Sequence, residues 1–188
     1  MNNKYCLFII LLLGAVIIAG GAGATRPAGG DKAYLPLNEG VKDLSFLSAD
    51  EVEILETVNK TRRAGPAAGS LGPLKISRGL SFASKERAEE LARPNKPVIS
   101  KEEGRSRLFE RVRKFGKWNG TVAEIDSYGY YGNAVVTELM KDSSLAKQQP
   151  RSYIVDANFT VMGVGCTPAG YPAPICVITF ASEFEETR

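Results

Sequence analysis

Histidine is absent from all 188 residues of the sequence. Histidine is the usual ligand of catalytic zinc and the usual general base near neutral pH, so this chain cannot assemble a Ser-His-Asp or a Cys-His catalytic group. Oxygen atoms alone can bind metal ions, but the sequence has no Asp-rich loop with the spacing of a calcium site. We therefore expect no metal ion and no other cofactor.

A strong excess of either charge is also missing. The 24 Lys and Arg residues nearly balance the 21 Asp and Glu residues, and a net charge of +3 does not predict binding to nucleic acid. The chain is 44% apolar and 24% charged, which is typical of a globular protein. Its length predicts one domain of ordinary size.

Cysteine is scarce, with three residues in the chain. Cys6 lies in the apolar segment 1–24, which contains one lysine and ends in the small residues Ala22 and Ala24. This pattern is typical of a secretory signal peptide cleaved after Ala24, and an uncleaved membrane anchor is the alternative. Cleavage leaves Cys166 and Cys176 as a pair in an exported, extracellular chain, so we expect them to form a disulfide.

Residues 25–46 are rich in Gly and Pro and are predicted to be a linker, followed by a domain over residues 47–188. Ser48 and Glu51 form a capping box for a first helix, and Gly116 is expected to end a third helix as a left-handed cap. Helices that flank a short, mainly antiparallel sheet predict an α+β fold, a three-layer α-β-α sandwich. The expected helices are 48–63, 76–91, 105–116 and 132–142, and the expected strands are 121–127, 159–166 and 175–182.

Two patterns suggest catalytic chemistry. Ser144 and Lys147 have the S-x-x-K spacing of a serine-lysine hydrolase, but the motif is short and lies in a polar run, which favours a solvated loop. Glu89 and Glu90 could suggest paired catalytic acids. Adjacent residues on a helix do not face each other, so we interpret this pair as solvated surface.

The predicted third helix also has a basic face, made of Arg107, Arg111 and Lys114. Such a face could dock an acidic partner, an anionic lipid surface or a glycosaminoglycan. The opposite face is apolar, so an ordinary amphipathic helix is the favoured interpretation.

Asn-x-Ser/Thr sequons occur at Asn59, Asn119 and Asn158, where composition alone would give about one. In a eukaryotic secretory pathway all three are possible glycosylation sites. In a bacterium they would mean little.

Three segments in order resemble motifs of the CAP superfamily, the SCP-like extracellular domain of cysteine-rich secretory proteins, antigen 5 and plant pathogenesis-related proteins. They are ILETVNKTRRAGPAAGSLGPLKIS, RLFERVRKFGKWNGTVAEIDSYG and PRSYIVDANFTVMGVGC with ICVITFASEF. They resemble a V-N-x-x-R helix, a G-E-N-I-S-Y-G segment and a G-H-R segment that leads into a G-V-G-C hairpin. The resemblance covers about Ser48 to Phe184, and it implies an α-β-α sandwich and secretion.

In many CAP proteins two histidines and two acidic residues can hold a divalent metal in a cleft. By this resemblance Glu124 takes the place of the glutamate in G-E-N, while the histidine positions fall on Pro150 and near Ser100. We therefore expect a remnant cleft without a metal. A buried Glu124 would have to be hydrogen-bonded, paired with a cation such as Arg151, or protonated, and a role in orienting neighbouring backbone is the alternative. The residues of the remnant cleft are Glu124, Asp142, Pro150, Arg151 and Ser100.

These observations predict a secreted or surface-exposed module without catalytic activity, which binds either a protein partner or an apolar ligand such as a lipid or a sterol. One alternative is a hydrolase that uses Glu124, or Ser144 with Lys147. Another is a structural protein that stays at the membrane because its amino-terminal segment is not removed.

Overall fold

The computed structural model describes residues 43–64, 71–94, 100–141, 150–168 and 173–187. The predicted signal peptide, most of the predicted linker, Asp142, Ser144 and Lys147 lie outside these residues. The described part contains five helices and four strands: α1 (Ala49–Ala64), β1 (Lys75–Ile76), α2 (Arg78–Ala92), α3 (Lys101–Arg113), β2 (Gly116–Tyr128), α4 (Asn133–Lys141), α5 (Pro150–Ile154), β3 (Val161–Cys166) and β4 (Ile175–Glu186).

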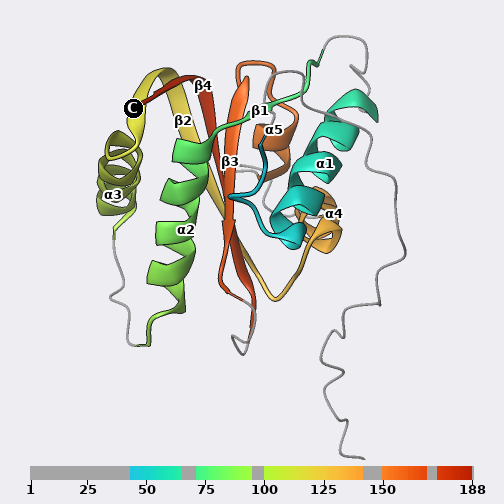
Figure 1. Cartoon of the computed structure of the whole chain (residues 1–188), viewed down its shortest axis with the longest axis horizontal. Helices are drawn as coiled ribbons and strands as arrows, with labels where there is room; N and C mark the ends of the chain where they lie inside the picture. Colours follow the sequence, from blue (N-terminus) through green and yellow to red (C-terminus); the bar gives the residue numbers. More distant parts are fainter. Residues whose placement is uncertain (1–42, 65–70, 95–99, 142–149, 169–172, 188) are drawn as a thin grey trace, which may run out of the picture. The chain divides into compact units, whose positions relative to one another are not determined.

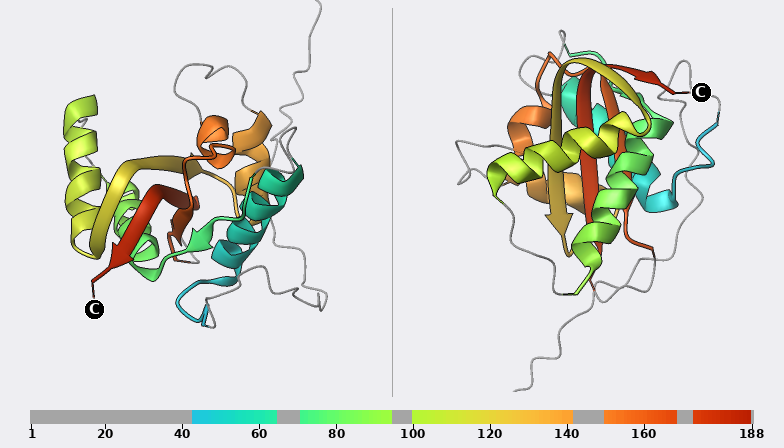
Figure 2. Two further views of the ribbon diagram at one scale, coloured as in Figure 1. Left: turned by 90° about the horizontal axis from the view of Figure 1, so that it is seen from above. Right: turned by 90° about the vertical axis from the view of Figure 1, so that its left-hand side faces the viewer.

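The four strands form one sheet in the order β1-β3-β4-β2, in which β1 runs parallel to β3 and the other pairs are antiparallel. Helices α2 and α3 cover one face of this sheet, and α1, α4 and α5 cover the other (Figure 1). The same three layers are visible when the molecule is seen from above (Figure 2). The predicted α+β sandwich with a mainly antiparallel sheet is therefore confirmed.

Alternation along the strands divides the core between the two faces. In β4, Ile178 and Phe180 belong to the apolar cluster under α1, whereas Val177 and Ala181 belong to clusters under α2. Successive side chains of a strand point to opposite faces, so a fully apolar strand serves both layers. This periodicity also decides which face each polar residue of β2 reaches.

Two glycines of β3 let α2 lie close against the sheet. A side-chain carbon at Gly163 would collide with the backbone at Leu80, and one at Gly165 would collide with the backbone at Lys85. Glycine is needed where two backbones approach this closely. The G-V-G-C motif therefore has a packing role, because it sets the distance between α2 and the sheet.

Helix α2 begins two residues later than the sequence predicted. Lys75 and Ile76 form β1 instead, because the Lys75 N–H donates to the carbonyl of Thr160 at 2.9 Å in the parallel pairing with β3. Ser77 then caps the helix, and its side chain accepts a hydrogen bond from the Leu80 N–H at 3.1 Å. Parallel pairing with a distant strand leaves no local sequence signal, which explains the error.

The prediction that Gly116 caps the third helix is wrong. Helix α3 runs from Lys101 to Arg113, and Gly116 is the first residue of β2, outside the glycines that have a positive φ. A side chain at Gly116 would collide with the carbonyl of Glu185 and the ring of Phe184. Glycine is therefore used here for close packing against β4. Helix α5, which is five residues long, was not predicted either.

The predicted capping box of α1 is confirmed. The Ser48 N–H donates to the Glu51 carboxylate at 2.7 Å, and the Glu51 N–H donates to the Ser48 hydroxyl at 3.3 Å. These reciprocal bonds satisfy two backbone donors at the start of the helix. They also fix Glu51, whose side chain has a second role at the disulfide.

Asn59 is fully buried in α1. Its side-chain oxygen accepts from the Leu74 N–H at 2.8 Å, and its side-chain nitrogen donates to the Leu74 carbonyl at 3.1 Å. A glycan on this nitrogen would break these bonds and would have no space in the folded chain. The burial of Asn59 therefore argues against a glycan at this sequon in the folded chain.

Arg62 is another polar side chain that α1 buries, besides Glu51 and Asn59. Its guanidinium group donates to four backbone carbonyls in the segments before β1 and before β3, and burial lowers its pKa from the ordinary arginine value. Asn59 and Arg62 are the polar positions of the V-N-x-x-R motif. The motif therefore binds the backbone of the segments that lead into β1 and β3. The carbonyls are those of Gly72, Ile154, Asp156 and Phe159.

Over the described residues, no helix has both the length and the apolar character needed to span a membrane.

Candidate functional site

Glu124 lies in the middle of β2 and faces the layer of α2 and α3, because its neighbours Ala123 and Ile125 face the α1 core. Arg111 of α3 places one guanidinium nitrogen 2.7 Å and 2.8 Å from the two carboxylate oxygens of Glu124. Arg87 of α2 approaches the same carboxylate at 3.6 Å. Two arginines from two helices therefore balance this buried carboxylate.

The same two arginines also contact other acids. Arg87 donates to Asp126 at 3.0 Å and to Glu90 at 3.2 Å, and Glu90 in turn accepts from Arg107 at 2.9 Å and lies 3.5 Å from Arg111. Three arginines thus converge on Glu90, so the interpretation of Glu90 as solvated surface is wrong. We refer to the following set as the ion-pair network: Arg87, Glu90, Arg107, Arg111, Glu124 and Asp126.

The two glutamates of the network have pKa values shifted in opposite directions. Burial raises the pKa of Glu124, and the nearby Asp126 charge adds to this effect, so that the two arginines do not fully offset it. Burial also acts to raise the pKa of Glu90, but hydrogen bonds from Arg87 and Arg107 outweigh it and lower the pKa. Glu124 is therefore easier to protonate than a free glutamate, and Glu90 is harder to protonate.

The basic face predicted on the third helix does not remain a free cationic surface. Arg111 turns inward and is 7% exposed, Arg107 contacts Glu90 and Glu103, and Lys114 contacts Glu86 at 2.7 Å. Each member of this face thus has an acidic partner. The sequence shows the period of the charges, but it does not show which acids of α2 and β2 oppose them.

Of the predicted remnant cleft, Asp142 lies outside the described residues, and the structure separates Ser100 and the backbone of α5 from Glu124. Pro150 and Arg151 begin α5, which lies on the α1 face of the sheet (Figure 1), whereas Glu124 faces α2 and α3. Ser100 caps α3 at the end away from Arg111, and its exposed side chain accepts from the Glu103 N–H at 3.1 Å. The cations beside Glu124 are therefore Arg111 and Arg87.

The residues around Glu124 do not fit the divalent metal of the family cleft. A metal would need several oxygen or nitrogen ligands, whereas the groups that contact the Glu124 carboxylate are the positively charged Arg111 and Arg87 and the hydroxyl of Thr179, which donates at 3.4 Å. Within the described ranges, no group of three potential metal ligands occurs. The guanidinium groups already supply the positive charge that a buried carboxylate needs.

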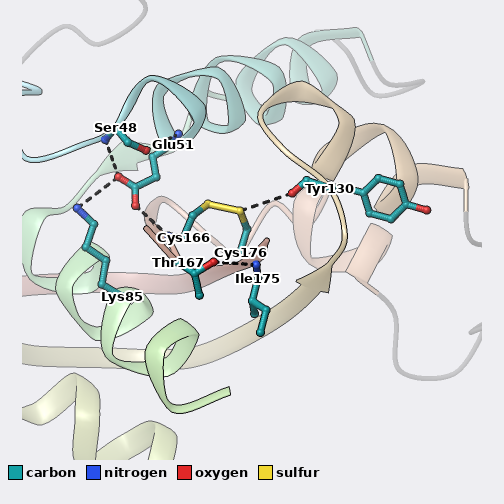
Figure 3. The surroundings of a disulfide bond; sticks show 8 residues. All are labelled: Ser48, Glu51, Lys85, Tyr130, Cys166, Thr167, Ile175 and Cys176. Atoms are coloured by element: carbon teal, nitrogen blue, oxygen red, sulfur yellow. Dashed lines mark hydrogen bonds and ion pairs between the residues drawn. A yellow bond between two sulfur atoms is a disulfide. The ribbon is translucent and has the colours of Figure 1, made fainter. Parts of the chain in front are cut away.

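Cys166 and Cys176 form the predicted disulfide, across the paired ends of β3 and β4. Figure 3 shows how this end of the hairpin is attached to other elements. The buried Glu51 of α1 accepts from the Cys166 N–H at 2.9 Å and lies 3.3 Å from the Lys85 ammonium group of α2. The sulfur of Cys176 also lies 3.9 Å from the carbonyl oxygen of Tyr130.

Tyr130 belongs to residues 128–132, with the sequence YGYYG, which we call the tyrosine segment. Tyr128, Tyr130 and Tyr131 are 49%, 39% and 39% exposed, and they are the large apolar side chains that stand out as exposed among the described residues. Sequence reasoning treated this stretch only as part of a family motif. Three tyrosines spaced by glycines in a turn were the signal that could have found it.

The tyrosine segment is held at both ends. The Gly129 N–H donates to the Pro174 carbonyl at 2.8 Å, and Gly129 has a φ of 84°, which favours glycine. Gly132 has a φ of 48°, and its carbonyl accepts a hydrogen bond from the Val135 N–H at 3.2 Å in the first turn of α4. The aromatic side chains are thus displayed on a fixed backbone.

The fold and these motifs define a three-layer α-β-α module whose hairpin carries a disulfide. The sequence model of the Cysteine-rich secretory protein family (CAP) matches residues 55–179, and the chain belongs to this family. Proteins of this family are generally not enzymes and are typically extracellular. No curated protein sequence matches the chain.

Solved structures show the same fold. An outer surface protein from Borrelia burgdorferi superposes with a TM-score of 0.54 at 16% identity, covering 73% of this chain and 93% of that one. A cysteine-rich secretory protein from Staphylococcus aureus gives a TM-score of 0.50 at 16% identity, covering 71% of this chain. The match spans only 39% of the Staphylococcus aureus chain. At such identities the likeness concerns the fold alone.

Proposed function

We propose that the chain is a secreted or surface-exposed binding module without catalytic activity, and that its tyrosine segment contacts a protein partner. The observation that carries this proposal is the exposure of Tyr128, Tyr130 and Tyr131 within four residues of a fixed backbone. Tyrosine is enriched at protein interfaces because it offers a large contact area and a hydroxyl group at a low cost in side-chain entropy.

The surroundings of the tyrosines favour a protein surface over a lipid or a sterol. An apolar ligand needs a concave site lined mainly by apolar side chains. Tyr128 instead lies on the same face of β2 as Asp126, and both Asp126 and Arg87 influence its pKa, which burial raises. Gly132 lies against the carboxylate of Glu53. Charged groups beside exposed aromatic rings suit the polar rim and aromatic centre of a protein interface.

The absence of histidine and the engagement of Glu124 support a role without catalysis. A general acid or base must reach a substrate, whereas both oxygens of Glu124 already contact Arg111 at 2.7 Å and 2.8 Å. The Ser144 and Lys147 pair lies outside the described residues, and no observation favours a hydrolase. The amino-terminal segment and the disulfide support secretion.

The proposal is tested with the secreted chain and two matched variants. The first carries Tyr130→Ala and Tyr131→Ala, and the second carries Lys117→Ala, an exposed position at the other end of β2. Each chain is immobilised and exposed to extracellular proteins of its host, and the affinity of every protein retained by the unmodified chain is then measured. We expect the tyrosine variant to bind at least about tenfold more weakly, which corresponds to about 1.4 kcal/mol.

Lys117→Ala should bind like the unmodified chain. Equal binding by the tyrosine variant would exclude this surface. Native mass spectrometry after exposure to a crude lipid extract tests whether the chain binds a lipid or a sterol instead. If a lipid stays bound to the unmodified chain and is lost from the tyrosine variant, the ligand of the tyrosine segment is apolar and not a protein.

A further inference from the structure

The three sequons differ in what the folded chain does with their asparagines. Asn59 is fully buried and both polar atoms of its side chain are bonded to Leu74. Asn119 and Asn158 are exposed. Of three sequons, two therefore present the side-chain nitrogen at the surface, and the third cannot carry a glycan in the folded chain.

Asn119 lies at an irregularity of the sheet. The register of β2 against β4 shifts between Asn119 and Val122, and Gly120 between them has a φ of 81°. The Asn119 side-chain nitrogen donates to the carboxylate of Glu183 at 3.0 Å, an exposed bond that water can replace. A β-bulge at a sheet edge turns a side chain out of the regular pattern, so a substituent on Asn119 has room.

Asn158 lies in the turn between α5 and β3. Its backbone N–H donates to the Asp156 carboxylate at 2.8 Å, a local bond of the turn, while the following Phe159 is buried in the core. The third residue of the sequon, Thr160, is exposed and donates its hydroxyl to the Ser182 carbonyl at 2.6 Å. The turn is thus anchored by Phe159 and leaves the Asn158 side chain outside.

Strand register places both exposed sequons at one end of the sheet. Val122 of β2 and Val161 of β3 both pair with Ala181 of β4. Asn119 and Asn158 each come three residues before one of these valines, so both lie near the same end of the sheet. Ser127 and Cys166 both pair with Cys176, at the level where the tyrosine segment begins. Nine residues of β2 separate Asn119 from Tyr128, which at about 3.3 Å per residue is about 30 Å.

We propose that Asn119 and Asn158 carry N-linked glycans, that Asn59 does not, and that the glycans cover the end of the sheet opposite the tyrosine segment. The donor is an oligosaccharide attached to a lipid diphosphate in the secretory pathway of a eukaryotic host. The side-chain nitrogen forms a bond to C1 of the first sugar and loses one proton. The bond from that carbon to the diphosphate oxygen breaks, and the lipid diphosphate leaves with the electron pair and takes up the proton.

Glycans at these two positions do not cover the tyrosine segment. A glycan is large and hydrophilic, so it blocks contacts where it is attached and favours contacts at the uncovered end. The inference goes beyond the proposed binding function, since glycan attachment is read out without any partner. A chain without glycans would therefore not contradict binding of a protein partner, and a chain without a partner would not contradict glycan attachment.

The full chain is produced in a eukaryotic secreting host, and its intact mass is measured before and after release of N-linked glycans by an amidase. We expect two glycans on the unmodified chain. Asn119→Gln and Asn158→Gln should each remove one glycan, and the double variant should have the mass of the bare chain. Thr121→Ala, which ends the Asn119 sequon but keeps the asparagine, should behave like Asn119→Gln.

Thr61→Ala is the matched control, because it ends the Asn59 sequon and leaves the buried Asn59 amide in place. It should still carry two glycans. A bare unmodified chain would overturn the proposal, as would a single glycan. A glycan that persists in the double variant, or one that is lost in Thr61→Ala, would show that Asn59 is used and would also overturn it.

Discussion

Arg111 of α3 contacts both carboxylate oxygens of Glu124 of β2 with a single guanidinium nitrogen, at 2.7 Å and 2.8 Å. The two side chains are 8% and 11% exposed, so the pair is shielded from water. In the family cleft implied by the sequence resemblance, a glutamate at this position helps to hold a metal ion. In this chain a side chain of the protein provides the positive charge, which ties α3 to the sheet.

Arg111 and Glu124 should be strongly coupled in stability. Arg111→Met leaves Arg87 as the remaining cation beside a buried carboxylate, and we expect it to lower the free energy of unfolding by about 3 kcal/mol. Glu124→Gln should cost less, because the amide oxygen still accepts a hydrogen bond. The double variant should lose less than the sum of the two single losses. Urea unfolding of the four chains measures this, and additivity within about 0.5 kcal/mol would show that the pair does not interact.

The opposite pKa shifts of Glu124 and Glu90 predict opposite dependences on pH. The pKa of Glu124 is raised above 4.5 in the folded state, so the folded chain binds more protons there and the contribution of Glu124 to stability is lost as pH rises through the folded pKa. The pKa of Glu90 is lowered below 4.5, so its contribution is present above 4.5 and is lost as pH falls through the folded pKa.

Urea unfolding between about pH 3 and pH 7 tests these signs with Glu124→Gln and Glu90→Gln as separate variants. The stability of the unmodified chain relative to Glu124→Gln should increase as the solution becomes more acidic. Its stability relative to Glu90→Gln should decrease over the lower part of the range. Parallel curves for the two variants would contradict the assignment of the shifts.

The sequence predicts the fold well because its main signals are local. Apolar spacing, the Ser48 and Glu51 capping box and the β-rich runs place three of the four predicted helices within two residues and find all three predicted strands. Two of these strands are longer than predicted, because β2 begins at Gly116 and β4 ends at Glu186. Helix α3 starts earlier than expected, at Lys101, because its first turn is polar and depends on the Ser100 cap. The elements missed, β1 and α5, are short and are fixed by distant contacts, such as the Arg62 bond to the Ile154 carbonyl at 2.9 Å.

The candidate site was predicted less well, because the sequence does not show which face of the sheet each helix covers. The sequence placed a carboxylate at Glu124, which if buried would be hydrogen-bonded, paired with a cation such as Arg151, or protonated. Strand alternation sends Glu124 to the α2 face, while α5 packs on the α1 face. Only the three-dimensional order of the layers decides that Arg111 is the partner. The same is true of the exposure of the tyrosines, which depends on where the turn leaves the sheet.

Reduction of the Cys166–Cys176 disulfide should destabilise the chain without unfolding it. The two cysteines are 10 residues apart, and closing so short a loop contributes about 2 to 3 kcal/mol by restricting the unfolded chain. Urea unfolding with and without a reductant measures the loss. A variant with Cys166→Ala and Cys176→Ala should start from the lower stability and show no response to the reductant. A reductant effect of similar size in that variant would show that it does not act through this bond.

Close packing of α2 on β3 should make Gly163 intolerant of any side chain. The added methyl group of Gly163→Ala meets the backbone of Leu80, which belongs to a helix and cannot rotate away. Overpacking of this kind costs about 1 to 3 kcal/mol or more, because α2 has to move from the sheet. Gly72→Ala is the matched control, since nothing lies within 4 Å of the added carbon. We expect thermal unfolding to show a large loss for Gly163→Ala and little change for Gly72→Ala. Similar melting temperatures for the two variants would mean that α2 does not need glycine beneath it, and that the spacing of the layers is set by other contacts.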